Sequence, residues 1–527
     1  MTATGEAQDL VYRRRWWTLA CLCLSLVLIV ANNSSLNVNL PVLQRALNSS
    51  NSGLQWIVDA YSLVFAGLLL PAGALADRYG RKTALQFGLV VMGVASLLAM
   101  FGTDTWQVIA CRAAMGVGAA FVMPGTLSIL TNVFPPTERG KAIAIWAGFA
   151  GFGGVLGPLA SGYLLDHFYW GSAFFINLPI IGLALGAGLF LVPNSKDPGD
   201  TVIDPPGVVL VVAGLFVLLY GVIDGPERGW LTPTIIIAVG AGAVLLAGFT
   251  WWELHARDPM LDMRLFTNRG FAIGSGTITL QYFALYGLFF IFSQYLELSK
   301  GYAPFKTAVV QVPIGLLSMF GAPLSAPLVR RYGPRVVVGS GLLFTAAGLA
   351  ILATAHPSTP LAVLVPGELL IGLGIGQTTA PSTTLIMTSV RLSKAGVGSA
   401  VNDVSRELGG ALGIAVLGSI LNSAYRGSIG RRLPPGLPPV VAADAHRSVT
   451  DALLATSNRR VHLAPAQAQQ LVGAVKATFA HSFGYAMMGG AVMLALCSAM
   501  VWTFQRPAAE HDRLSAGTRP SPSRPPA

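Results

Sequence analysis

The chain has 527 residues, of which 53% are hydrophobic and only 11% are charged. Soluble globular proteins carry about 25% charged residues, so this composition excludes a soluble enzyme or binding module and predicts an integral membrane protein. The formal net charge of +11 does not indicate nucleic-acid binding, because the basic residues lie in short segments beside apolar runs rather than in a polar domain.

Long apolar runs organise the chain. At about 1.5 Å per residue, each run is long enough to cross a bilayer core of about 30 Å as a helix. The first run follows the basic and aromatic segment 13–17 and is too long for the core of a signal peptide, so we expect it to remain as a span. The sequence predicts fourteen spans, at residues 16–40, 54–76, 83–101, 106–130, 140–164, 172–192, 207–224, 233–252, 271–296, 307–328, 335–354, 361–387, 396–422 and 482–504.

The short loops between the spans predict the orientation. Loops on the side shared by the two termini carry most of the loop arginines and lysines. By the positive-inside rule, both termini are expected in the cytoplasm and the protein in the cell inner (plasma) membrane. The short loops of the other side carry only Arg45, Arg228, Lys300 and Lys306.

A charged loop with two glycines joins the second and third spans, and a reduced copy of it lies in the second half of the chain. The copy, at 321–335, again separates two apolar runs. This repetition predicts two related halves. The informative residues of the first copy are Gly73, Asp77, Arg78, Gly80, Arg81 and Lys82.

These six residues resemble the loop signature of the major facilitator superfamily. The resemblance implies an all-α integral membrane fold with two pseudo-symmetric six-helix bundles. It also implies that Asp77 holds the halves together on the cytoplasmic side in the outward-facing state. There it would lie against the positive end of a helix from the other half, with Arg78 and Arg81 as charge partners. The alternative interpretation is a basic turn that only fixes topology.

Fourteen spans exceed the superfamily core of twelve by two, and the extra pair lies in the middle, as in the fourteen-span drug/proton antiporter branch. The expected order is a cytoplasmic tail, a six-helix bundle, an inserted helix pair, a second six-helix bundle and a disordered tail rich in Pro, Ser and Arg. A long extracellular loop with short amphipathic helices is expected before the last span. These segments cover residues 1–15, 16–192, 207–252, 271–504 with the loop at 425–480, and 505–527.

The fifth span has glycines at three- and four-residue spacing. Such spacing leaves a helix face without side chains, on which a neighbouring helix can pack closely, while a proline bends the helix. The pattern resembles the antiporter motif of exporting facilitators, and generic helix packing is the alternative. The motif residues are Gly153, Gly157, Pro158 and Gly162.

Two ionisable residues occupy corresponding places in spans 4 and 12. Arg112 matches the span-4 arginine that the resemblance implicates in proton coupling, and Glu368 takes that place in the second half. A charged side chain within the membrane costs about 3 kcal/mol or more, so each should face a wet cavity or a partner. The alternative for both is a structural salt bridge between helices.

Span 2 carries an acid between two aromatic residues. Asp59 lies in a segment similar to the multidrug-exporting members of the branch, in which this aspartate handles protons or cations. An interfacial carboxylate is the alternative. Trp56 and Tyr61 are suited to stack on a flat cationic substrate, or to anchor the helix at the membrane interface.

Span 13 carries two further acids. Asp403 and Glu407 are four residues apart and therefore share one helical face, with Arg406 as a counter-ion. The resemblance assigns acids at these positions to protonation and substrate selectivity, and a place in a cytoplasmic vestibule is the alternative.

Asn32 departs from the pattern of the branch. An acidic residue is usual at this place in span 1, whereas asparagine keeps only hydrogen-bonding capacity. The loss of an embedded negative charge puts recognition of divalent organic cations in doubt and favours neutral or monovalent lipophilic compounds.

The remaining motifs do not indicate catalysis. The four cysteines lie in apolar runs without metal-ligand spacing, so we expect neither a disulfide nor a metal site. The sequence contains no His-Glu-x-x-His, Gly-x-Ser-x-Gly or phosphate-binding Gly-x-x-x-x-Gly-Lys-[Ser/Thr] motif. We therefore expect no enzyme activity and no cofactor other than a proton gradient.

The sequence thus favours proton-coupled secondary active efflux of lipophilic, cationic or neutral drugs by alternating access. The expected partners are the lipid bilayer, protons and a small lipophilic substrate, without nucleic acid, and the chain is expected to act as a monomer. Three alternatives within the membrane class remain: a dedicated exporter of one endogenous metabolite or lipid, a proton-coupled importer, and a non-transporting sensor.

Overall fold

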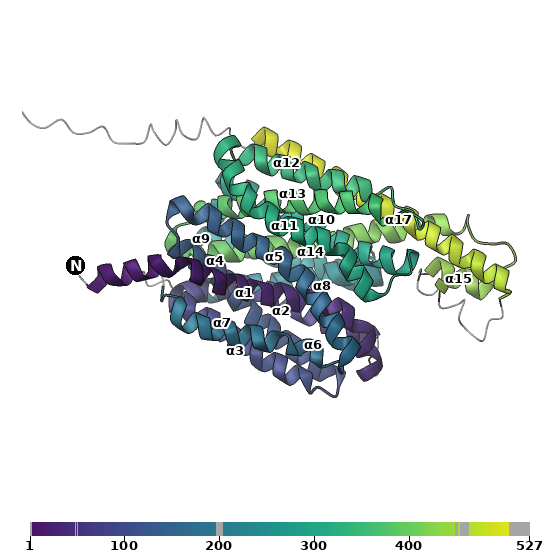
Figure 1. Ribbon diagram of the computed structural model, residues 1–527, viewed down its shortest axis with the longest axis horizontal. Coiled ribbons are helices and arrows are strands. Elements are labelled where there is room, and N and C mark those ends of the chain that lie inside the picture. The colour runs from purple at the N-terminus through teal and green to yellow at the C-terminus, as the bar shows by residue number, and fades with distance from the viewer. Residues whose placement is uncertain are drawn as a thin grey trace, which may run out of the picture.

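The computed structural model describes residues 3–47, 49, 51–195, 204–447, 449, 452–453 and 463–504 (Figure 1). Fourteen helical segments are long and apolar enough to cross a membrane, which confirms the predicted number of spans. The described ranges contain no β-strand, so the fold is all-α. The long helices are α1 (Ala3–Leu47), α2 (Asn51–Tyr79), α3 (Arg81–Met100), α4 (Thr105–Val133), α5 (Pro136–His167), α7 (Asn177–Leu191), α8 (Pro205–Arg228), α9 (Pro233–His255), α10 (Arg269–Gln294), α11 (Pro304–Tyr332), α12 (Pro334–Leu352), α13 (Leu361–Thr388), α14 (Ala395–Ile429) and α17 (Pro465–Phe504).

Short elements complete the described chain. The short helix α6 precedes α7 and belongs to the same span, and α15 lies in the segment between α14 and α17. Three further short turns lie before α10, after α10 and before α14. The short elements are α6 (Ser172–Phe175), η1 (Met263–Thr267), η2 (Tyr295–Ser299), η3 (Leu392–Lys394) and α15 (Pro439–Arg447).

The helices form two bundles. In Figure 1, α1, α2, α3 and α7 (purple to blue) lie in the lower part and α10–α13 (teal to green) in the upper part, with α5 and α14 between them. Buried side chains form two large hydrophobic clusters, of which one comes mainly from α1–α7 and the other mainly from the later helices. We call the end of the bundles beside the N-terminus the N-terminal face, and the end beside α15 the α15 face.

The inserted helices α8 and α9 pack on each other, and α8 also packs where the two bundles meet. A small hydrophobic cluster joins Leu63 of α2 to Leu219 of α8, with Leu408 of α14 packed against it. One inserted helix therefore contacts both halves of the molecule.

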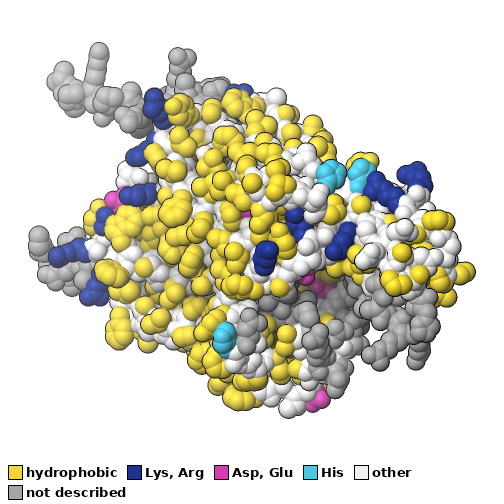
Figure 2. Space-filling view, turned by 45° about the vertical axis from the view of Figure 1, so that its right-hand side comes forward, with side chains coloured by type: hydrophobic (Ala, Val, Ile, Leu, Met, Phe, Trp, Pro, Cys, Tyr) yellow, Lys and Arg dark blue, Asp and Glu magenta, His cyan; other side chains and the backbone are white. Residues whose placement is uncertain are grey.

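The outer surface of the spans is apolar. Phe190 is 79% exposed and Val244 is 71% exposed, and Figure 2 shows a broad hydrophobic surface with Lys and Arg side chains along its left margin and a few more towards its centre and right. Monomeric soluble proteins rarely expose apolar patches of more than a few hundred Å². This surface is therefore suited to contact lipid.

The segment expected as a long loop at 425–480 is shorter in the structure. The helix α14 continues to Ile429, and α17 begins at Pro465, well before the apolar run that predicted the last span. The extension of α17 is rich in alanine and glutamine, which favour helix without giving an apolar signal, and the short extension of α14 contains polar residues and an arginine. The tail expected to be disordered, 505–527, lies outside the described residues.

Candidate functional site

Asp77 connects the two bundles at the N-terminal face. Its side chain is 3% exposed, and its carboxylate accepts hydrogen bonds from the backbone N–H groups of Gly396, at 2.9 and 3.0 Å, and Val397, at 3.3 Å. These N–H groups belong to the first turn of α14, where they have no partner within the helix. A carboxylate at this position is stabilised both by the hydrogen bonds and by the helix dipole.

Arg81 completes this contact. Its Nε lies 2.8 Å from Asp77 Oδ1, and its Nη2 donates to the carbonyl oxygens of Leu392, at 2.8 Å, and Ser393, at 3.0 Å. The side chain is 2% exposed. Arg81 therefore both neutralises the buried carboxylate and binds the loop that precedes α14.

Glycines allow α2 and α14 to approach at this point. A Cβ atom added at Gly73 would lie 2.6 Å from the carbonyl oxygen of Gly396, and one added at Gly396 would lie 2.5 Å from that of Gly73. The next loop glycine, Gly80, has φ +114°, which L side chains rarely adopt. The glycines at 73 and 80 thus serve close packing and the turn, respectively.

Two basic residues of the loop lie outside this contact. Arg78 was expected as a second partner of Asp77, but it is exposed and its guanidinium lies 5.3 Å from the ring centre of Tyr79. The physical reason is helical geometry, since Arg78 directly follows Asp77 and points in another direction, whereas Arg81 is one turn away. Lys82 Nζ donates to the carbonyl oxygen of Leu189 at 2.7 Å.

A second cluster of charged and aromatic side chains is buried between the bundles. Asp403 is 1% exposed and Arg406 is 3% exposed, and Asp403 Oδ1 lies 3.9 Å from Arg406 Nη1. The Arg406 guanidinium lies 5.1 Å from the ring of Trp146 on α5 and 5.2 Å from the ring of Tyr282 on α10. An arginine of the second bundle therefore contacts a tryptophan of the first.

Polar neighbours hold Asp403 in place. Asn402 Nδ2 donates to Asp403 Oδ1 at 3.0 Å, and Thr383 Oγ1 of α13 donates to Asn402 Oδ1 at 2.9 Å. The other carboxylate oxygen of Asp403 receives no hydrogen bond from a described residue. Glu407, one turn further along α14, is half-buried. The carboxylates expected at this place are thus close together on α14, and the free oxygen of Asp403 can accept a proton or a polar group.

Arg112 lies in the core of the first bundle. It is fully buried, its Nε donates to the carbonyl oxygen of Ile57 at 3.0 Å, and its guanidinium lies 4.3 Å from the ring centre of Tyr61. Within the described chain it forms no ion pair, so the interhelix salt bridge considered for it is absent there. Its partners are instead a carbonyl and an aromatic face of α2.

Glu368 lies apart from these clusters. Its side chain is fully buried in α13, and neither carboxylate oxygen has a hydrogen-bond or ion-pair partner among the described residues. A neighbouring glycine, Gly367, packs against Gly348 of α12. The structure therefore places Glu368 within the second bundle and brings no basic partner to it in the described part of the chain.

Asn32 forms a polar contact within the first bundle. It is 2% exposed, and its Oδ1 accepts from Asn177 Nδ2 of α7 at 3.0 Å. Asn177 Nδ2 also donates to Ser96 Oγ of α3, at 3.1 Å. This polar contact joins three helices of one bundle, so the role that the geometry gives Asn32 is to connect helices.

The motif of α5 uses its glycines on two sides. A Cβ atom at Gly157 would collide with Ala31 and Ser34 of α1 in the same bundle. One at Gly153 would lie tightly against Val30 of that helix, at 3.0 Å. Gly148 and Gly151 instead face α11 of the other bundle, with Cβ positions 2.6 and 2.9 Å from its carbonyl oxygens. The helix continues through Pro158, and Gly162 is buried.

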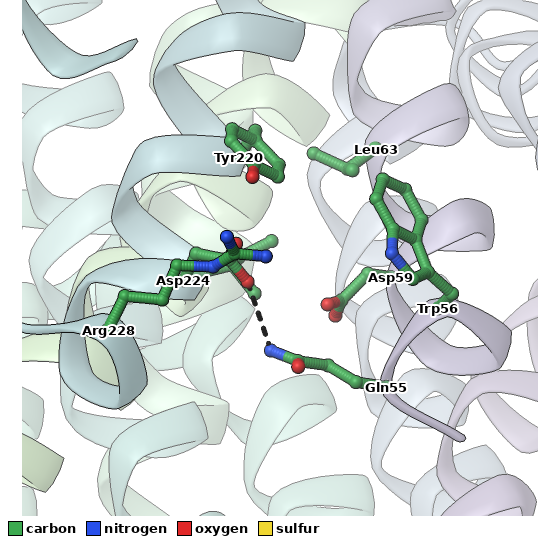
Figure 3. A pocket seen from close by; sticks show the side chains of 8 residues that line it. Gln55, Trp56, Asp59, Leu63, Tyr220, Asp224 and Arg228 are labelled. Atoms are coloured by element: carbon green, nitrogen blue, oxygen red, sulfur yellow. Dashed lines mark hydrogen bonds and ion pairs between the residues drawn. The ribbon is translucent and has the colours of Figure 1, made fainter. Parts of the chain in front are cut away.

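A small cavity of about 10 Å³ lies between α2 and α8 near the α15 face (Figure 3). The helix α2 lines it with Gln55, Trp56, Asp59 and Leu63, and α8 with Tyr220, Ile223, Asp224 and Arg228. Asp59 therefore lies about two turns inside α2 and faces the inserted helix α8.

Sequence reasoning did not single out several of these residues. Trp146 and Tyr282 lie within apolar runs, where nothing distinguishes a site aromatic from a core aromatic. Asp224 carried a signal that could have found it, because it is the acid at the end of an inserted span and has an arginine one turn later.

The fold and these sites define a multi-pass membrane protein with ionisable groups buried where its two helical bundles meet. Residues 22–414 match the model of the Major Facilitator Superfamily, and the chain belongs to this family. The family and the fold are those of transporters.

Several named proteins are similar to the chain. It is 32% identical to the methyl viologen resistance protein SmvA of Salmonella typhimurium over 93% of its length and 98% of that protein. It is also 32% identical to the multidrug efflux pump LfrA of Mycolicibacterium smegmatis, over 93% and 96%. The solved structure of the proton:xylose symporter XylE shares the fold at a TM-score of 0.60 and 13% identity, covering 94% of this chain and 96% of that one.

Proposed function

We propose that the protein exports lipophilic cationic or neutral drugs from the cell by alternating access, coupled to proton entry. The named relatives support drug efflux as the class of activity. The observation that carries the mechanism is that α14 bears both the contact with Asp77 at its first turn and the buried pair of Asp403 and Arg406 further along. A change at the buried pair can therefore reach the contact that closes the N-terminal face.

The proton acts on the charge balance of this helix. With Asp403 ionised, the pair with Arg406 is neutral, and protonation leaves the Arg406 charge facing Trp146 and Tyr282 without its counter-ion. An uncompensated buried charge is costly, so protonation favours a state in which Arg406 reaches water or another partner. That preference links proton binding to movement of α14 against α5.

The proposed orientation places the N-terminal face in the cytoplasm of a cell whose plasma membrane the protein spans. Basic residues of this face, such as Arg78, Lys82 and Arg330, support this through the positive-inside rule. A proton that enters across 100 mV supplies about 2.3 kcal/mol, enough for export against a gradient of tens-fold. Because one chain carries both bundles, the proposal takes a monomer as the transporting unit.

Ethidium accumulation in pump-deficient cells tests the proposal. We expect the wild type to lower accumulation, a protonophore to abolish the effect, and Asp403→Asn to reduce export at least tenfold. Asp258→Asn is the matched control, because Asp258 is exposed in the loop after α9, and it should export like the wild type. Export that survives the protonophore would overturn proton coupling. If cells with the protein in the membrane accumulate every drug tested as much as cells without it, drug export would be overturned. Export of one dedicated metabolite would then be favoured.

A further inference from the structure

The inserted helix α8 presents three functional side chains to α2, one per turn. Tyr220, Asp224 and Arg228 are four residues apart and therefore share one helical face. Figure 3 shows this face opposite Trp56 and Asp59, across the cavity near the α15 face. Two helices that differ in origin, one from the bundle and one inserted, thus build one site.

A buried carboxylate and a partly exposed arginine form the charged part of this site. Asp224 is 6% exposed, its Oδ1 accepts from Gln55 Nε2 at 3.2 Å, and Arg228 Nε lies 2.8 Å from its Oδ2. That second contact is not aligned as a hydrogen bond, and Oδ2 receives none from a described residue. Asp59 lines the same cavity. One oxygen of the buried Asp224 carboxylate can therefore accept another cation in place of the guanidinium.

Aromatic rings flank the carboxylates. The rings of Trp56 and Tyr220 are stacked with centres 6.3 Å apart and planes 21° apart. Trp230, just after α8, packs on Gly225 and donates from Nε1 to Ser419 Oγ of α14 at 2.8 Å. Indole and phenol faces attract cations and provide flat apolar contact.

The backbone of Arg228 is held in place by neighbouring contacts, whereas its side chain is about half exposed to solvent. The turn after it depends on Gly229, with φ +92°, and on Thr232 Oγ1, which donates to the Arg228 carbonyl at 2.6 Å. The guanidinium side chain, however, is 52% exposed, against 9% for its partner Asp224. With the arginine in place, the cavity of about 10 Å³ has room for about one water molecule.

We propose that α2 and α8 form a subsite for an aromatic organic cation. In the empty subsite the Arg228 guanidinium pairs with the Asp224 carboxylate, and the cation displaces the guanidinium when it binds. This inference rests on the proposed export of cationic drugs and assigns the inserted helix a part in choosing them. The cation takes the place of the guanidinium on Asp224, lies against Trp56 and Tyr220, and leaves through the α15 face. Arg228 acts as a tethered competitor and so sets how strongly a cation must bind to enter.

Equilibrium binding to the full-length protein in nanodiscs, at fixed pH and ionic strength and without a proton gradient, tests the subsite. The probes are tetraphenylphosphonium, with one charge, and methyl viologen, with two. Arg228→Gln should tighten tetraphenylphosphonium binding about fivefold, the factor that loss of a partly exposed ion pair supplies. It should tighten methyl viologen binding as well, because the Asp224 carboxylate then lacks its competing guanidinium.

Further variants separate charge from folding. Arg228→Lys keeps the competing charge and should bind both probes like the wild type. Asp224→Asn in addition to Arg228→Gln should remove the gain. Arg426→Gln is the matched control, since Arg426 is an exposed arginine near the α15 end of α14. The subsite is refuted if Arg228→Gln binds both probes no better than the wild type, or if the gain persists without the Asp224 carboxylate.

The outcome is distinguishable from failure of the proposed function. Binding is measured without transport or a gradient, so an absence of proton coupling would leave the Arg228 effect intact. Conversely, wild-type cells that export ethidium while all variants bind alike would retain the transport proposal and reject the subsite.

Discussion

The charged loop occurs twice in the molecule, but among the described residues only its first copy places a charged side chain in a contact between the two bundles. Both copies end a helix with a glycine of positive φ, +114° at Gly80 and +80° at Gly333. When the copies are aligned on these glycines, Asp77 of the first corresponds to Arg330 of the second. Asp77 is buried against α14, whereas Arg330 is exposed.

The difference shows that the turn and the contact are separate properties of this sequence. The glycine provides the turn in both halves, while the contact needs an acid on one side and free N–H groups on the other. The first turn of α14 offers the N–H groups of Gly396 and Val397. Its counterpart α5, the fifth span of the first half, begins after Pro135 with Pro136, and proline has no N–H group.

Of the variants that test this difference between the two copies, Asp77→Asn should have the largest effect on efflux. It removes the charge that Arg81 and two helix N–H groups share, and it leaves a buried guanidinium without its counter-ion. Breaking such a pair costs about 3–5 kcal/mol, which here falls on the state with the N-terminal face closed. We expect at least a tenfold loss of ethidium efflux, measured in cells at matched protein levels, with Asp258→Asn unaffected. Full activity of the variant would show that the contact does not take part in the transport cycle.

Gly396→Ala tests the close approach that makes the contact possible. Its Cβ would lie 2.5 Å from the Gly73 carbonyl oxygen and 2.7 Å from Asp77 Oδ1, so α14 must shift. Forced overpacking costs about 1–3 kcal/mol, and we expect a lower melting temperature and reduced efflux. Gly427→Ala is the control on the same helix, because a Cβ there meets nothing within 4 Å. Equal melting temperatures for the two variants would contradict the packing argument.

The fold was largely predictable, because each membrane-spanning helix corresponds to a long apolar run in the sequence. Both halves and the inserted pair followed from those runs and from the repeated loop. The polar extensions of α14 and α17 did not, since neither segment contains a long apolar run.

The candidate site was less predictable than the fold. Ionisable residues inside spans stand out, as Arg112, Glu368 and Asp403 do, but their partners lie on helices that are distant in the sequence. Asp77 and its partner Gly396 are separated by 319 residues, and no local pattern connects them. Likewise, the hydrogen bond that places Asp224 in the site comes from Gln55 on α2, which is distant in the sequence.

Gly80→Ala and Gly333→Ala should separate the turn from the contact. Both positions combine a positive φ with an extended ψ, a conformation that residues other than glycine rarely adopt, so an alanine at either should cost about 1–3 kcal/mol of stability. The melting temperatures should therefore fall alike, while efflux should fall further for Gly80→Ala because Arg81 follows directly. Gly140→Ala, where a Cβ meets nothing within 4 Å, should change neither quantity. If efflux falls by the same amount for both turn variants, the two loop copies contribute equally to transport.

Arg330→Asp should have the smallest effect, and it bears most directly on why the asymmetry exists. It gives the second copy the acid of the first, but the start of α5 lacks the N–H of Pro136 and carries an acid of its own, Glu138, in its first turn. A second carboxylate there would meet fewer donors and a like charge, so no second contact should form and efflux should stay within about twofold of the wild type. The decisive comparison is Arg330→Asp combined with Asp77→Asn. If the double variant remains as inactive as Asp77→Asn alone, the N–H groups at the start of the partner helix decide where the contact between the bundles can form. If efflux returns, the acid alone decides it, and the prolines of α5 are irrelevant to the contact.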